Sequence, residues 1–330
     1  MEYRTLGRSG LQVSEIAYGN WIIRPSEGQD LALKEALEQG ITMFDTADIY
    51  GGGLGEELLG KTLSSVRRET VQICTKVYSR SYPGPNGKGL SRKHITDSVH
   101  ASLRRLRTDY IDLYQAHRYD PQTPLEETLR TFDDLVRQGK VLYIGVSEWT
   151  AAQIRDGLRI AGELGLERII SNQPQYNMLW RVIEADVIPA CEEGGLSQIA
   201  WSPMAQGLLA GKYRPGKALP LASRAQGPAR SQFATGGLAD EVLTRVSRLA
   251  TLAADLGITM PQLAIAWVLS NPNVSAAIIG ASEAAQVKEN VAAPGVKLDP
   301  AALSTIDQIL GPVIERDPGK TPSQPGDYGK

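Results

Sequence analysis

Short apolar runs alternate with segments of helical periodicity along most of the chain. The runs are rich in β-branched and aromatic residues, each ends in polar residues, and they predict eight β-strands: 15–20, 41–47, 71–77, 110–117, 141–147, 168–173, 197–203 and 275–282. Between them, apolar residues recur at helical spacing, for example over 30–39, 56–63, 93–106, 125–137 and 243–256. Nearly continuous apolar strands are typical of a parallel sheet covered by helices on both faces. Eight such units favour an α/β fold of the closed (β/α)₈ TIM barrel type over an open sheet.

The segments outside these units predict a cap, two long loops and a tail. Residues 3–15 alternate between apolar and polar around Gly7 to Gly10, which predicts a β-hairpin that covers the N-terminal mouth of the barrel. The segments 78–90 and 212–237 are rich in Gly, Pro and polar residues, and loops of this length are usually functional or mobile. We expect one barrel domain over residues 1–311, followed by a polar, loosely ordered tail over 312–330.

Composition and charge narrow the functional classes. The 330 residues include 35 Lys and Arg against 37 Asp and Glu, mixed along the chain, so nothing electrostatic indicates nucleic acid or an anionic membrane surface as a partner. No apolar run approaches the roughly 18 residues of a membrane span, and the segment MEYRTLGRSG lacks the charged start and long apolar stretch that are typical of a secretion signal. Cys74 and Cys191 each lie in an apolar run, which indicates core thiols and a reducing compartment. We therefore expect a cytoplasmic protein.

Polar residues whose side chains are able to take part in catalysis lie at the ends of the predicted strands, where the active sites of (β/α)₈ barrels lie. Asp45, Lys76 and His117 end the second, third and fourth strands, and Tyr50 follows Asp45 closely. Each alone has an ordinary explanation, such as a cap, a surface aromatic, a solvated lysine or a core histidine. Because the four residues lie at or near the ends of consecutive strands, we favour one shared active site.

These four residues suit a general acid built around a tyrosine. A free tyrosine titrates near pH 10, and lowering its pKa by about two to three units requires about 3 to 4 kcal/mol. A lysine cation about 4 Å from the phenol oxygen supplies about 4 kcal/mol at an effective dielectric constant near 20. Asp45 is expected to keep Lys76 charged and oriented, and His117 either to donate to the substrate's carbonyl oxygen or to assist proton delivery.

Other motifs limit the remaining possibilities. GGGLG at 51–55 has neither the ending of a P-loop nor the Rossmann spacing, so we interpret it as a flexible turn that positions Tyr50. The three histidines, His94, His100 and His117, include two on one predicted surface helix, and no His and Cys cluster has metal-ligand spacing. We expect no metal site.

Several motifs together resemble the aldo-keto reductase superfamily over nearly the whole chain. They are MEYRTLGRSGLQVSEIAYGNW, FDTADIYGGG, CTKV, DLYQAHRYDPQTPLEETL, IGVSEW, SNQPQYNML, WSPMAQGLLAGKY and IIGASEAAQVKENV. The DLYQAHRYD segment and the loop after the third strand are similar to the branch that includes bacterial relatives of potassium-channel β-subunits. The resemblance implies Tyr50 as general acid, Asp45 and Lys76 as residues that tune it, and His117 as the residue that orients the carbonyl.

Reduction of a carbonyl also needs a hydride, which no side chain supplies, so a nicotinamide cofactor is implied. By resemblance, Ser147 and Gln173 hold the carboxamide and Trp201 stacks on the ring, although Trp201 is also interpretable as a core aromatic. Arg224 matches a position that meets the 2′-phosphate and favours NADPH. The other residues implied in binding NADP(H) are Trp21, Ser202, Met204, Gln206, Gly207, Leu208, Lys212, Gly280, Ser282, Gln286, Glu289 and Asn290. Glu148 stands where many relatives carry Asn or Arg, so it receives no role.

These features predict an NADPH-dependent reductase whose main substrates are aldehydes, with ketones as a secondary class. The alternative is a nucleotide-sensing regulatory subunit that binds NADPH with little turnover. A barrel enzyme acting on sugar phosphates through residues 280–282 is disfavoured, because no second carboxylate or metal set accompanies them. Trp21, Tyr50, His117 and Tyr82 are expected to wall an apolar substrate slot. The sequence leaves the substrate and the oligomeric state open.

Overall fold

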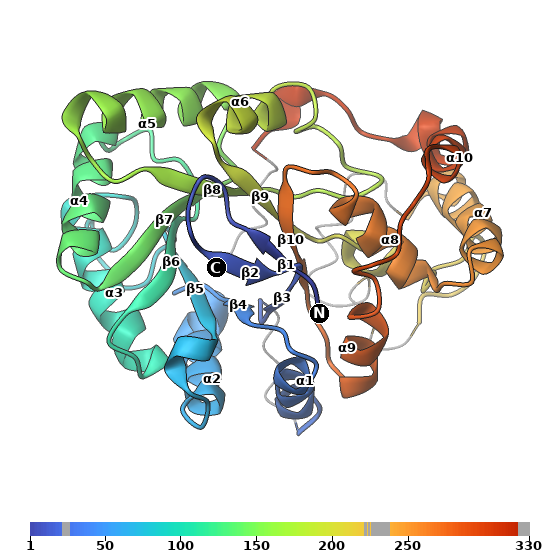
Figure 1. The fold of residues 1–330 in the computed structure, drawn as a ribbon, viewed down its shortest axis with the longest axis horizontal. Helices are drawn as coiled ribbons and strands as arrows, with labels where there is room; N and C mark the ends of the chain where they lie inside the picture. The colour runs from blue at the N-terminus through green and yellow to red at the C-terminus, as the bar shows by residue number, and fades with distance from the viewer. Residues whose placement is uncertain (22–26, 221–222, 224, 226–237, 323–330) are drawn as a thin grey trace.

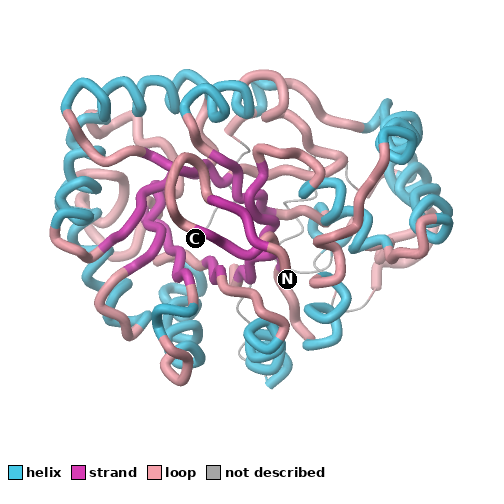
Figure 2. The backbone as a smooth tube through the Cα atoms, in the orientation of Figure 1, coloured by secondary structure: helices cyan, strands magenta, loops and turns pink. Residues whose placement is uncertain are grey.

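The computed structural model describes residues 1–21, 27–220, 223, 225 and 238–322 and has a closed barrel of parallel strands at its centre (Figures 1 and 2). Around the barrel the strands follow one another in chain order, and the last closes onto the first. The barrel strands are β3 (Ile16–Gly19), β4 (Met43–Asp45), β5 (Gln72–Val77), β6 (Ile111–Ala116), β7 (Val141–Ser147), β8 (Ile169–Gln173), β9 (Ser197–Trp201) and β10 (Val274–Ile279). Each falls within or next to one of the eight predicted runs, so the predicted TIM barrel is confirmed.

Helices form the outer layer; α1 to α8 lie between successive strands, and α9 and α10 follow the last strand (Figure 1). They are α1 (Glu27–Glu38), α2 (Leu54–Leu63), α3 (Arg92–Leu106), α4 (Leu125–Arg137), α5 (Ala151–Leu164), α6 (Val187–Gly194), α7 (Asp240–Asp255), α8 (Met260–Leu269), α9 (Ala284–Asn290) and α10 (Pro300–Leu310). Local sequence fixes some starts: Thr150 and Thr259 each form a capping box with a glutamine three residues later, at the first turns of α5 and α8. Within the described ranges no single helix is long and apolar enough to cross a membrane, and α7 and α8, which pass that test only as a pair, are bent by 88° between them.

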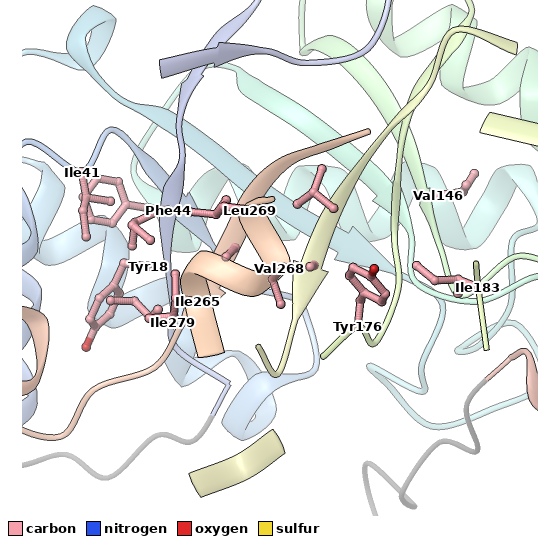
Figure 3. Packing of buried hydrophobic residues seen from close by; sticks show 14 of the residues in the cluster. Tyr18, Ile41, Phe44, Val146, Tyr176, Ile183, Ile265, Val268, Leu269 and Ile279 are labelled. Atoms are coloured by element: carbon pink, nitrogen blue, oxygen red, sulfur yellow. The ribbon is translucent and has the colours of Figure 1, made fainter. Parts of the chain in front are cut away.

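Two apolar layers result from the alternation of side chains along each strand. Tyr18 and Phe44 belong to a large cluster that joins the strands to the surrounding helices, and Figure 3 shows the helix residues Ile265 and Val268 in the same packing. The residues that alternate with them form a smaller cluster inside the barrel, which includes Ala17, Met43, Cys74, Leu113 and Ile199. Because the period of a strand is two residues, the next inward positions toward the carboxyl end are Gly19, Asp45, Lys76, Gln115 and Trp201. The interior of the barrel is therefore apolar toward the amino ends of the strands and more polar toward their carboxyl ends.

The predicted N-terminal hairpin is present and covers the end of the barrel where the strands begin. Strand β1 (Tyr3–Thr5) pairs antiparallel with β2 (Gln12–Ser14), and the pair lies over the barrel in Figure 1. Leu6 and Val13 are fully buried against the inner cluster. The Gly7 amide donates to Ser197 Oγ at 2.7 Å, and Ser275 Oγ donates to the Thr5 carbonyl at 2.8 Å, so the hairpin is attached where β9 and β10 begin.

Two expectations about the periphery need correction, and a third lies largely outside the described residues. The tail does not loosen at residue 312, because Glu315 exchanges backbone hydrogen bonds with Leu179 and Arg181. His94 lies on the buried side of α3, where its Nδ1 bonds the Gly89 carbonyl at 2.8 Å and ties down the 78–90 loop. The predicted 212–237 loop falls largely outside the described residues, as does the end of the tail over 323–330.

The contact between α2 and α3 requires a glycine at position 60. A Cβ atom there would lie 2.4 Å from the backbone oxygen of Arg105 and 2.6 Å from the carbonyl carbon of Leu106. We expect Gly60→Ala to lower the free energy of unfolding by about 1 to 3 kcal/mol, because one helix must move away from the other. Gly162→Ala in α5 is the matched control, since a Cβ there meets nothing within 4 Å, and it should raise stability by about 0.5 to 1 kcal/mol. Urea unfolding measures the stability of both variants. A Gly60→Ala variant as stable as the wild type would contradict the close contact between α2 and α3.

Candidate active site

A cavity of about 300 Å³ opens at the carboxyl ends of the barrel strands. This is the end at which (β/α)₈ barrels carry their active sites, and the volume lies at the lower end of the usual range for ligand pockets. Segments far apart in the chain contribute to its wall. Of the residues singled out in the sequence, those lining it are Trp21, Asp45, Tyr50, His117, Ser147, Gln173, Trp201, Ser202, Met204, Gln206, Gly207, Lys212, Gly280, Ser282, Gln286, Glu289 and Asn290.

Lys76 lies under the cavity and joins Asp45 to Tyr50. Its side chain is fully buried, and Nζ donates to Asp45 Oδ1 at 2.6 Å, to the Thr46 carbonyl at 2.7 Å and to the Tyr50 hydroxyl at 3.4 Å. A protonated lysine has three N–H donors, so these three acceptors satisfy it completely. Asp45 in turn accepts from Gln173 Nε2 at 2.9 Å through its other oxygen. Residues from three strands and one loop therefore form one hydrogen-bonded network.

The glycine stretch after Tyr50 forms the turn that holds the tyrosine over this network. Gly51, Gly52 and Gly53 have φ angles of 59°, 67° and 101°, a left-handed backbone that only glycine adopts readily over consecutive residues. Gly53 then begins α2 as its N-cap. The Tyr50 ring meets His117 edge to face, with ring centroids 5.7 Å apart. The interpretation of GGGLG as a positioning turn agrees with this geometry.

Burial and neighbouring charges shift the pKa values of the three ionisable groups beside the cavity. Burial raises the pKa of Tyr50 more than Lys76 lowers it, and the Asp45 carboxylate raises it further. Burial, together with the cations of Lys76 and Arg118, lowers the pKa of His117 well below its ordinary value. Although burial lowers the pKa of Lys76, Asp45 and Tyr50 raise it, and the net shift is upward. At neutral pH the site holds a protonated tyrosine, a neutral imidazole and a lysine cation.

This result corrects the expected pKa of the tyrosine. The sequence argument counted the attraction of Lys76 for the phenolate but not the loss of solvation on burial, which is the largest contribution. The lysine cation limits the rise in the Tyr50 pKa and does not bring that pKa below its ordinary value. Tyr50 thus retains its proton at neutral pH, as a general acid must.

On the opposite side of the cavity, Glu148 fixes the indole of Trp201. Glu148 is 3% exposed, and its Oε1 accepts from Trp201 Nε1 at 2.8 Å and from the Gln175 amide at 2.6 Å. Ser147, one residue earlier, donates through Oγ to the Gln173 carbonyl at 2.8 Å. Trp201 is half-buried, packs against the inner apolar cluster and lines the cavity. Glu148 received no role from the sequence, although an acid next to Ser147 at a strand end was a signal for one.

The rim beside Trp201 has a strained backbone. Glu148, Ser202, Ala205 and Gln206 have φ angles of 57°, 56°, 45° and 58°, in the left-handed region that residues other than glycine seldom adopt. Such residues cluster at ligand-binding sites because the surrounding structure must hold them in place. Gln206 Oε1 is buried and accepts no hydrogen bond from the described residues. The segment therefore presents an unused acceptor to whatever occupies the cavity.

Four of the residues predicted for the site are not found in the wall of the cavity. Lys76 lies beneath the cavity and is not part of its wall, and Leu208 is buried in the outer apolar cluster. Arg224 lies outside the described residues. Tyr82 is wrong as a wall of the substrate slot, because its hydroxyl donates to Asn86 and to Asp97 on α3, away from the cavity.

Sequence reasoning missed other residues that line or support the site. Arg118 directly follows His117 and lines the cavity, so its position at a strand end was a usable signal. Gln115, two residues before His117, lies within 3.5 Å of both Asp45 and Gln173, which strand alternation implies once the register is known. Gln29 and Pro261 line the cavity from the first turns of α1 and α8. No sequence pattern around them indicated a site. In the described parts of the chain, no three His, Cys, Asp or Glu side chains gather in a group able to hold a metal ion.

Known proteins are similar to this chain over nearly its whole length. The model of the Aldo/keto reductase family matches residues 15–311. A probable voltage-gated potassium channel subunit beta from Arabidopsis thaliana is 41% identical over 322 residues, covering 94% of this chain and 97% of the relative. A protein of the same description from Oryza sativa subsp. japonica is 39% identical and covers 98% and 99%. A putative voltage-gated potassium channel subunit beta from Schizosaccharomyces pombe is 41% identical and covers 93% of each chain. With a family match across almost all of the barrel, the chain belongs to the aldo/keto reductase family.

Proposed function

We propose that the protein reduces aldehydes and ketones to alcohols with NADPH, with Tyr50 as the general acid. The observation that carries the proposal is the buried Lys76 ammonium, which hydrogen-bonds Asp45 and Tyr50 beneath a cavity that also contains His117. Overall, a carbonyl compound, NADPH and a proton give an alcohol and NADP⁺. The substrate is a small molecule, because the cavity is about 300 Å³.

The residues on the Trp201 side fit a nicotinamide dinucleotide. Trp201 offers a flat, hydrogen-bonded indole for the nicotinamide ring, and Ser147 and Gln173 lie beside it for the carboxamide. The Lys212 cation lies farther along the same wall, where a diphosphate needs donors and positive charge. When bound, the cofactor would supply the hydride.

The side chains of this protein would perform the proton transfer. The neutral His117 imidazole and the Tyr50 hydroxyl are both able to donate a hydrogen bond to a carbonyl oxygen in the cavity. As negative charge develops on that oxygen, Tyr50 transfers its proton, because an alkoxide is a much stronger base than a phenolate. The Lys76 cation, 3.4 Å from the phenol oxygen, then stabilises the phenolate.

The alternative function is a regulatory subunit that binds NADPH with little turnover. It is supported by the descriptions of the similar plant and fission yeast proteins as channel subunits. NADPH consumption with 4-nitrobenzaldehyde separates the two functions: steady turnover supports the reductase, whereas tight NADPH binding without turnover supports the regulatory subunit.

The first prediction concerns the general acid. Tyr50→Phe should lower kcat for 4-nitrobenzaldehyde reduction at least a hundredfold, because it removes the proton donor and keeps the ring. The Kd for NADPH should stay within about threefold, since the hydroxyl lies on the Lys76 side of the cavity. Steady-state kinetics and fluorescence titration measure the two quantities. A variant with wild-type kcat would assign the acid to another residue.

The second prediction concerns Lys76 and the pH dependence of alcohol oxidation, which needs Tyr50 as phenolate. The rate of oxidation rises with pH through the pKa of Tyr50. Lys76 lowers that pKa through its charge, so Lys76→Met should move the inflection of the pH profile to higher pH. Oxidation at neutral pH should then be slower, because a smaller fraction of Tyr50 is ionised there, and a rise of 1 in the pKa slows it about tenfold. Steady-state oxidation rates measured across the pH range give the profile.

Two controls separate charge from packing in this experiment. Lys76→Arg keeps a cation but not its geometry, so it should be slower than wild type while the inflection stays lower than in Lys76→Met. Circular dichroism must show a folded barrel, because leaving Asp45 buried without its partner costs about 3 to 5 kcal/mol. An unaltered pH profile in folded Lys76→Met would rule out electrostatic tuning of Tyr50.

The third prediction concerns the cofactor platform. Trp201→Ala should weaken NADPH binding by about 1 to 3 kcal/mol, as loss of a stacked aromatic does. Glu148→Ala should weaken it less, by releasing the indole, and Glu148→Gln should restore most of the affinity, because its amide oxygen still accepts from Trp201 Nε1. Fluorescence titration with NADPH measures all three. Identical affinities in Glu148→Ala and wild type would show that the hydrogen bond does not position the indole.

A further inference from the structure

Arg118 places a positive charge at the end of the cavity where Tyr50 and His117 lie. It follows His117 directly and lines the cavity, and its Nη1 donates to the His117 carbonyl at 2.7 Å. Its Nε is buried and donates to no described atom. A buried N–H group of a charged side chain is costly unless a partner satisfies it, so this geometry needs an explanation.

Comparison with the other arginines shows that Arg118 differs from them. Among the described arginines that are buried or half-buried, each of the others has a carboxylate partner: Arg4 with Glu15, Arg68 with Asp112, Arg105 with Glu56, Arg130 with Glu126, Arg181 with Asp307 and Arg245 with Glu241. Arg118 forms an ion pair with no described carboxylate. The other partly buried guanidinium groups are thus paired with carboxylates, whereas the guanidinium group that lines the cavity, that of Arg118, has no carboxylate partner among the described residues.

The nearby acids already have other partners. Asp45 is paired with Lys76. Asp120, two residues after Arg118, accepts from the Leu90 amide at 2.7 Å and from the Thr123 hydroxyl at 2.8 Å. Glu289 lines the same cavity from the region after β10, on the side with Ser282 and Gln286. The charge of Arg118 therefore acts on the contents of the cavity without a local counter-ion among the described residues.

We infer that Arg118 binds an anionic oxygen group of the substrate, so that the preferred substrates are aldehydes or ketones that also carry a carboxylate or a phosphate. The inference rests on the proposed reductase function and adds the substrate class. A guanidinium presents paired N–H groups that match carboxylate and phosphate oxygens, and hydrogen bonds between such charged groups are the strong ones. Because Arg118 adjoins His117 in the chain, the anionic group and the carbonyl oxygen would be held within the same small cavity.

The test compares two substrates that differ in charge. Wild-type protein should reduce 4-formylbenzoate with kcat/KM about tenfold or more above that for methyl 4-formylbenzoate. Arg118→Gln should lower kcat/KM for the anionic aldehyde about tenfold more than for the ester, mainly through KM. Arg130→Gln, which replaces a partly exposed arginine of α4 outside the cavity, is the matched control and should leave the ratio between the two substrates unchanged. Glyceraldehyde 3-phosphate against glyceraldehyde repeats the comparison for phosphate and shows which of the two anions is preferred.

Two results would overturn the inference: equal kcat/KM for the charged and neutral members of both pairs, or an Arg118→Gln variant that loses activity equally toward both. A binding measurement keeps this test separate from the test of the reductase. If the wild-type protein reduces neither these aldehydes nor 4-nitrobenzaldehyde, the proposed reductase function is wrong. Calorimetric binding of 4-formylbenzoate that weakens in Arg118→Gln would still support the anion site, and no difference between the proteins would reject it.

Discussion

The burial of the Lys76 ammonium group is the constraint on which the rest of the site depends. A lysine with no exposed surface stays charged only if every N–H finds an acceptor, and here the acceptors are Asp45, the Thr46 carbonyl and Tyr50. Each acceptor lies on or just after β4, whereas Lys76 lies on β5, so the parallel register of these two strands sets the distances. The need to solvate one cation thereby fixes the position of the phenol oxygen.

The same network extends across the barrel to the side assigned to the cofactor. Asp45 accepts from Gln173, whose backbone carbonyl accepts from Ser147, and the next residue, Glu148, holds the indole of Trp201. Hydrogen bonds, joined through the backbone of Gln173 and the peptide bond between Ser147 and Glu148, therefore link the tyrosine side to the tryptophan side. The strained residues stand on the tryptophan side, while the tyrosine side relies on glycines for its left-handed turn. Rigid placement of both sides is what hydride and proton transfer to one carbonyl group would require.

The barrel was predictable from the sequence because it depends on periodicity, and periodicity is a local property. The alternation that places Met43 and Asp45 on one face of β4 is visible in the chain, and so is the glycine turn after Tyr50. The sign of the Tyr50 pKa shift was not predictable, because it depends on how many distant segments exclude water from the phenol oxygen. The hydrogen bond from Trp201 to Glu148 was equally inaccessible, since the two residues are 53 positions apart and meet only through the register of three strands. Sequence patterns locate strand ends, and only packing determines which of them touch.

The energetic cost of the Asp45 and Lys76 pair supports a functional reason for its presence. A buried ion pair contributes little net stability compared with apolar residues of the same volume, and an apolar pair at these positions would extend the inner cluster of Met43 and Cys74 toward the cavity. The fold itself therefore does not need these two charges. A protein that only bound a nucleotide would use the Trp201 side of the cavity and would gain nothing from a cation 3.4 Å from a phenol oxygen. The ion pair is useful only if the proton of Tyr50 moves, and this argument favours the reductase over a purely regulatory subunit.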